Sequence, residues 1–88
     1  MILSKSPATA WRVIEGEAVI LSLDTKVFRG LNAVGSRVWE LIDGRRSVDE
    51  IVEVIVREFE VTPERAATDV QDFVRELLDK ELVIRGGG

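Results

Sequence analysis

Apolar and polar positions alternate along the first third of the chain and then change to helical spacing. The alternating segments are residues 10–14, 18–23 and 27–31, and a period of two predicts β-strands. The second segment places on one face Val19, Leu21 and Leu23. Turn signals separate the segments, at Glu15-Gly16-Glu17 and at Asp24-Thr25-Lys26. Connections this short predict an antiparallel meander of three strands.

Three segments with helical spacing follow. The first runs from about Ala33 to Asp43, with Asn32 as its N-cap and Gly44 as the glycine after its end. The second opens with Ser47-Val48-Asp49-Glu50, which fits a capping box. The third opens with Thr62-Pro63-Glu64 and runs to about Lys80. Strands followed by helices predict an α+β fold, and this content is also that of a winged-helix domain.

The 88 residues predict a single domain over 1–88. We expect its core to span about 10–84, with residues 1–9 as a lead-in. The segment Leu82–Ile84 is expected to pack back on the core. Residues 85–88 end in three glycines and are expected to form a flexible tail.

The amino-acid composition excludes several kinds of catalytic and metal-binding site. The sequence contains no cysteine and no histidine, which removes thiolate nucleophiles, imidazole bases and the usual zinc ligands. We therefore expect no catalytic residues, no metal, no cofactor and no enzyme activity. No apolar run is long enough to span a membrane and no signal peptide precedes the first strand, so the expected location is the cytoplasm.

Charge argues against nucleic acid as a partner. The net charge is −4, and residues 32–88 carry all of the excess negative charge. The third helix has an acidic stripe at spacings of three and four, made of Asp69, Asp72, Glu76 and Asp79. Binding to a phosphate backbone depends on Lys and Arg. The stripe is either an ordinary solvated face or one wall of a binding site for a partner with basic groups.

The third strand, Val27 to Leu31, is the last of the meander, so no later strand is bound to pair with it. An open edge offers unpaired N–H and C=O groups that an extended peptide can complete as an added strand. A peptide between this strand and the third helix would meet Phe73 and Leu77 as apolar anchors. Alternatively, the 82–84 segment or the third helix covers this edge.

The sequence resembles the PqqD family, and most of the motifs that carry the resemblance lie from Gly30 onward. The pattern is G-L-N-x-x-G-x-x-x-W-x-L-x-D-G, a Ser/Thr-V-x-E-I helix, a D-V-x-x-F-V-x-x-L helix and a terminal Leu-Val. The resemblance covers about Trp11 to Ile84. It implies a winged-helix-like fold of three strands and three helices, and a role as a recognition element for ribosomally made, modified peptides.

The resemblance further implies that a precursor's leader peptide adds antiparallel to the third strand, in a groove closed by the third helix. The protein would deliver the peptide to a leader peptidase or a radical-SAM enzyme, and the free-standing length favours a lasso peptide pathway. The implied peptide-binding residues are Val27, Phe28, Arg29, Gly30 and Leu31 in the strand, and Asp69, Phe73, Glu76, Leu77 and Lys80 in the helix.

Two other functions remain open at this level. A winged-helix nucleic-acid-binding or transcription-related domain would show salt-sensitive binding to a DNA duplex. A carrier protein activated at its C-terminal glycines would gain mass when it is expressed with an activating enzyme.

Overall fold

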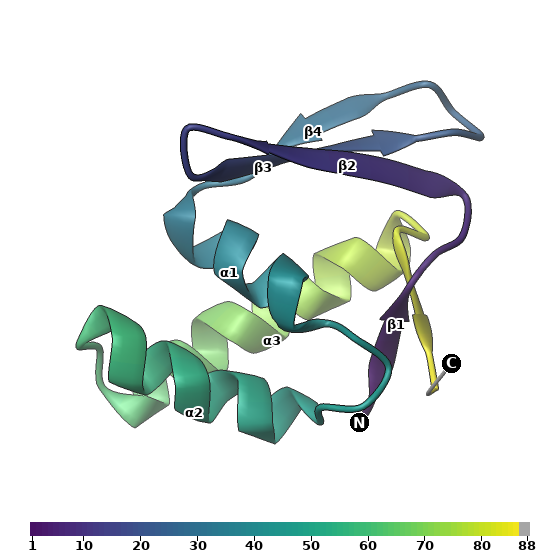
Figure 1. The fold of residues 1–88 in the computed structure, drawn as a ribbon. Coiled ribbons are helices and arrows are strands. Elements are labelled where there is room, and N and C mark those ends of the chain that lie inside the picture. Colours follow the sequence, from purple (N-terminus) through teal and green to yellow (C-terminus); the bar gives the residue numbers. More distant parts are fainter. Residues whose placement is uncertain (87–88) are drawn as a thin grey trace.

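The computed structural model of the chain describes residues 1–86. Its elements in order are β1 (Leu3–Lys5), β2 (Thr9–Ile14), β3 (Glu17–Ser22), β4 (Phe28–Gly30), α1 (Ala33–Leu41), α2 (Val48–Phe59), α3 (Pro63–Asp79) and β5 (Val83–Arg85). The predicted meander and the three helices are confirmed, so the fold is α+β and compatible with a winged-helix-like description. Figure 1 shows the three helices on one side of the meander.

The meander is a three-stranded antiparallel sheet in the order β2-β3-β4. Its inner face is fixed by β3, in which Ala18 and Ile20 are fully buried. Leu21 lies on the opposite, outer face, where it pairs with Phe28 of β4. The more apolar of the two alternating sets in β3 therefore faces outward, away from the helices.

The lead-in expected at residues 1–9 is instead a strand. β1 pairs antiparallel with β5, with Leu3 opposite Arg85 and Lys5 opposite Val83. Leu3 is buried in the core, which explains why this short segment is held. Arg85 and Gly86 also depart from the expected flexible tail, because the N–H of Gly86 donates to the Ile2 carbonyl at 2.8 Å. The rest of the expected tail, 87–88, lies outside the described residues.

The helix starts match the sequence signals. The Asn32 side chain accepts a hydrogen bond from the backbone N–H of Gly35 at 2.8 Å, so it caps α1. Ser47 and Glu50 form both hydrogen bonds of a capping box on α2, and Thr62 caps α3. Each bond satisfies a backbone N–H that the first turn leaves free. α1 ends at Leu41, before the expected Asp43, because Ile42 leaves the helical conformation.

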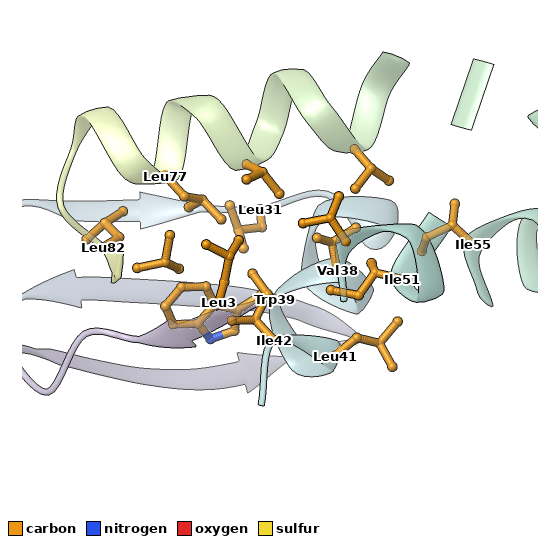
Figure 2. Close-up of a cluster of buried hydrophobic side chains, with 14 of the residues drawn as sticks. Leu3, Leu31, Val38, Trp39, Leu41, Ile42, Ile51, Ile55, Leu77 and Leu82 are labelled. Carbon is orange, nitrogen blue, oxygen red and sulfur yellow. The ribbon is translucent and has the colours of Figure 1, made fainter. Parts of the chain in front are cut away.

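Trp39 of α1 is the largest fully buried side chain. Figure 2 shows it among side chains from β1, α1 and the segment before β5. Its ring lies edge-on to Trp11 of β2, with 6.2 Å between centroids. The Lys5 ammonium lies 5.2 and 5.3 Å from the two ring centroids and donates to the Ile42 carbonyl. Burial lowers the pKa of Lys5, against the opposing charges of Asp43 and Glu40.

Candidate functional site

The outer edge of β4 is open. β4 is the last strand of its sheet and pairs only with β3 among residues 1–86. Leu31 N–H donates to the Ala18 carbonyl at 2.8 Å, and Ser22 N–H donates to the Val27 carbonyl at 3.0 Å. Because the hydrogen-bonding direction alternates along an antiparallel strand, the N–H and C=O groups of Phe28 and Gly30 point to the open side.

Ser36 holds the end of this strand in place. Its hydroxyl oxygen accepts from the Ala18 N–H at 2.7 Å and donates to the Leu31 carbonyl at 3.4 Å. The residue is buried, so these hydrogen bonds tie α1 to β3 and to the residue after β4 at a position shielded from solvent. This link fixes the distance between the open edge and the helices.

A groove separates the open edge from α3, and it has two deep parts. The first, which we call the Phe73 pocket, has a volume of about 540 Å³ and is lined by both apolar and polar side chains. Its wall residues come from the end of β4, the first turns of α1 and the middle of α3. They are Arg29, Gly30, Leu31, Asn32, Val34, Gly35, Val38, Asp69, Val70, Phe73 and Glu76.

The second part, which we call the Phe28 pocket, has a volume of about 440 Å³. It lies beside the start of β4 and the C-terminal end of α3. Its wall residues are Ile20, Ser22, Thr25, Val27, Phe28, Arg29, Asp79, Lys80, Glu81 and Leu82. Both pockets share Arg29, so they are neighbours along one groove.

Charged side chains line the helix side of the groove. Glu76 pairs with Arg29 across the groove at 2.6 Å and with Lys80 along the helix at 3.4 Å. Asp69 pairs with Arg65 at 3.1 Å. These pairs are all partly solvent-exposed, so their contribution to stability is small. The site therefore combines unpaired backbone groups on β4, two pockets and charged side chains at the rim. These features are suited to binding an extended peptide as an added strand.

Nine of the ten residues predicted for the site lie along this groove. Val27 and Phe28 are 60% and 70% exposed, whereas Leu31 is buried and lines the Phe73 pocket with the little surface that it exposes. Asp69, Phe73 and Glu76 line the first pocket and Lys80 lines the second.

Leu77 is the exception. Its exposed fraction is 0% and it belongs to the hydrophobic core. The predicted role of Leu77 as a peptide anchor is therefore wrong in this structure. The reason is helical geometry. Asp69, Phe73 and Glu76 form the face of α3 that lines the groove, whereas Leu77 lies on the adjacent face, which packs against the core.

The sequence reasoning missed the contribution of α1. Val34, Gly35 and Val38 line the Phe73 pocket. A β-carbon at Gly35 would stand 3.2 Å from the Asn32 side-chain oxygen and 3.5 Å from the Phe73 ring. A glycine in the first turn of a helix, where it costs stability relative to alanine, is a signal of such close approach.

Two further features of residues 1–86 bear on function. None of their helices is long and apolar enough to cross a membrane. In the same part of the chain, no three acidic, cysteine or histidine residues gather in a way that could hold a metal ion.

Comparisons with known proteins agree with the geometry. The family described as Coenzyme PQQ synthesis protein D (PqqD) matches residues 17–83. A solved structure titled "TbiB1 in Complex with the TbiA(beta) Leader Peptide" is 36% identical, with a TM-score of 0.86 over 97% of this chain and 99% of that one.

A second structure, "Lasso peptide synthetase B1 complexed with the leader peptide", shares the fold at 15% identity. Its TM-score is 0.85, over 97% of this chain and 100% of that one. No curated protein sequence matches. The family match spans most of the chain, and the chain therefore belongs to the PqqD family.

Proposed function

We propose that this protein is a non-catalytic adaptor that binds the leader region of a ribosomally made precursor peptide and delivers the peptide to a maturation enzyme. The observation that carries the proposal is the open edge of β4, which faces α3 across a groove lined by apolar and charged side chains. Strand addition at such an edge takes affinity from main-chain hydrogen bonds and selectivity from side-chain pockets.

The comparisons support the same function. Two solved relatives with this fold carry leader peptides, and one of them is 36% identical to this chain. The second is titled a lasso peptide synthetase, which favours a lasso peptide pathway, with a leader peptidase as the enzyme served, over a radical-SAM pathway. Precursor peptides are made by ribosomes, and the cytoplasm is the proposed place of action.

The proposed contacts follow the groove. The backbone groups of Phe28 and Gly30 pair with the peptide, and Val27, Arg29 and Leu31 flank it on the inner side. Asp69, Phe73, Glu76 and Lys80 form the opposite wall. Leu77 is left out because it has no exposed surface.

The nucleic-acid alternative is not favoured. Over the α3 segment, acidic residues exceed basic ones, and the two acids Asp69 and Glu76 line the groove itself. A recognition helix for DNA needs the opposite charge.

Nuclear magnetic resonance tests the proposal. The ¹⁵N-labelled chain is titrated with the TbiA(beta) leader peptide and with leader peptides of precursors encoded beside its own gene. We expect saturable amide shifts at residues 27–31 and along the 69–80 side of α3. If the folded chain shows no saturable shift with any of these peptides, or shifts that all lie elsewhere, the proposed function is wrong.

A cleavage assay tests the second part of the proposal, the delivery of the peptide to a maturation enzyme. The partner leader peptidase cleaves its precursor with and without the adaptor, and the Gly30→Pro variant serves as the binding-deficient control. Acceleration by the wild-type chain that the variant lacks supports the adaptor role. Equal rates in all three reactions contradict it.

A further inference from the structure

The three-stranded sheet has a second open edge, on the far side from β4. β2 pairs only with β3 among residues 1–86, and in Figure 1 no other strand of the sheet lies beyond it. It is also the longer edge, with six residues in β2 against three in β4. Five of the six residues are exposed and the sixth is half-buried, so no described element covers this edge.

The free backbone groups of this edge belong to Trp11 and Val13. Leu23 N–H donates to the Ala8 carbonyl at 2.8 Å, so Ala8 faces β3. The hydrogen-bonding direction alternates along an antiparallel strand, which makes every second residue after Ala8 face β3 as well. Trp11 and Val13 lie between these residues and direct their N–H and C=O groups away from β3. An added strand can bond to both of them.

Apolar side chains flank these groups on both faces of the sheet. Trp11 and Val13 lie opposite Ile20 and Ala18, so both are on the inner face, yet they are 42% and 46% exposed. Ile14 is on the outer face and is 49% exposed. Edge strands are commonly protected by lysine, proline or a bulge. β2 contains neither residue type, and its pairing with β3 is continuous over all six residues. An unprotected apolar edge of this kind is typical of an interaction surface.

The Trp11 side chain is already held in place in the unbound chain. Its ring lies edge-on to Trp39, and the Lys5 ammonium lies 5.2 Å from its centroid. A side chain that is fixed before binding loses little conformational entropy when a partner covers it. Trp11 is therefore suited to serve as the apolar anchor of this edge.

Arg12 gives the edge a charge preference. It is the only charged residue of β2, its side chain is on the outer face opposite Val19, and it forms no ion pair within residues 1–86. The residue opposite Arg12 on an added strand belongs to a non-hydrogen-bonded pair, with about 4.5 Å between the α-carbons. An acidic side chain at that position would pair with Arg12, whereas a basic one would be repelled.

A second copy of this chain does not meet the requirement. When β2 pairs antiparallel with β2, only one register joins both free residues, Trp11 to Val13, and it places Arg12 opposite Arg12. Like charges directly opposite destabilise a strand pair. The register centred on Trp11 places Val13 opposite Thr9, whose N–H already donates to a carbonyl before β2. The register centred on Val13 places Trp11 opposite Glu15, whose φ of 52° is not extended.

We propose that the free edge of β2 binds an extended segment of another protein as an antiparallel strand. The segment has an acidic residue opposite Arg12, between two apolar residues that face inward beside Trp11 and Val13. Because β2 and β4 are opposite edges of one sheet, this partner and a peptide on β4 are bound at the same time. The inference does not depend on the function proposed above, which concerns the other edge.

Selection of displayed peptides tests the proposal while the β4 edge is disabled. Random 12-residue peptides are selected on the immobilised Gly30→Pro chain and counter-selected on the Gly30→Pro, Val13→Pro double variant. Proline at position 13 removes an N–H that points away from β3, a change that edge strands tolerate. We expect enrichment of peptides with an acidic residue between two apolar ones. With the best peptide, amide shifts in the labelled wild-type chain should lie at residues 10–14 and not at 27–31.

A charge reversal supplies the second readout. Arg12→Glu should prefer peptides in which lysine or arginine replaces the acidic residue, and it should bind the original peptide about two- to thirtyfold more weakly. Arg75→Glu is the matched control, because it makes the same change in net charge at an exposed arginine of α3, and it should bind like the wild type. A purely structural role of Arg12 would not invert the preference. Arg12→Gln, which should abolish the preference, is used if Arg12→Glu does not fold, and it also replaces the double variant in the counter-selection if that chain does not fold.

Three results would overturn the inference. The first is that no peptide is enriched on the Gly30→Pro chain, or that the enriched peptides lack the acidic residue. The second is that the charge-reversed variant keeps the wild-type preference. The third is a dimer, seen by sedimentation at rising concentration, that Val13→Pro abolishes, because the occupant would then be a second copy. None of these results bears on leader binding at β4, which the titration described above tests separately.

Discussion

Replacing Gly30 by proline is the sharpest test of strand addition at β4. Gly30 pairs with Val19 of β3 at a position where its own N–H points away from β3 and toward the groove. Proline removes this donor and places its ring at the open edge, while the hydrogen bonds to β3 are kept. Proline is tolerated in edge strands for this reason. The variant should fold and lose peptide binding.

The magnitude follows from one hydrogen bond. A peptide carbonyl that had bonded to Gly30 would be left in the groove without a partner, which costs about 1–3 kcal/mol. This corresponds to a dissociation constant that is roughly 5- to 150-fold larger. The ring adds a steric term of the same sign, so the lower end of this range is the minimum effect.

Calorimetric titration with a leader peptide measures the change, and Gly30→Ala is the control. A β-carbon at position 30 meets no atom within 4 Å, and alanine keeps the N–H, so this variant should bind like the wild type. Circular dichroism establishes that both variants are folded. A folded proline variant with a dissociation constant within twofold of the alanine variant would refute strand addition at this edge.

Three further predictions follow from the described contacts. Phe73→Ala should weaken leader binding by about tenfold, since an apolar wall is lost, and Phe73→Leu should retain most of the affinity; equal binding by all three proteins would remove Phe73 from the site. Ser36→Ala leaves the buried Ala18 N–H without its acceptor and should lower the free energy of unfolding by about 1–3 kcal/mol in urea titrations, whereas a change near zero would mean that the link carries no stability. The hydrogen bond from the Arg37 guanidinium lowers the pKa of Glu58 from its ordinary 4.5. The contribution of this pair to the free energy of unfolding is therefore complete above pH 4.5 and is lost as pH falls through the lowered pKa. In Arg37→Met the unfolding free energy should therefore fall less steeply with acid, and an unchanged acid limb would contradict this.

Much of the fold was predictable because its signals are local. Alternation, turn residues and helix caps each act over a few neighbouring residues, and Asn32, Ser47 and Thr62 all cap the helices that they were expected to cap. The strand at the N-terminus was not predictable in this way. Leu3 and Lys5 pair with residues some eighty positions away, and a three-residue strand carries too short an alternation to stand out.

The sequence predicts the open strand edge more directly than it predicts which side chains face the groove. The open edge follows from strand order alone, so the sequence is enough to predict it at the segment Val27 to Leu31, and the structure shows it at β4. Periodicity places Phe73 and Leu77 on one side of α3, but it does not say where the apolar stripe ends and the groove begins. The structure puts Leu77 in the core and Phe73 at the boundary. The part played by Val34 depends on how α1 packs against α3, which no local pattern encodes, whereas Gly35 in the first turn of α1 is a local signal of close approach.

The pairing of β1 with β5 brings the two ends of the described chain together. Leu3 lies opposite Arg85, and neither strand contributes a residue to the Phe73 pocket or the Phe28 pocket. Adjacent termini permit circular permutation and insertion into a host protein. The domain could therefore be inserted into a loop of a host enzyme through both ends at once, or circularly permuted with new ends at the Glu15-Gly16 turn, and neither change would place a chain end in the groove.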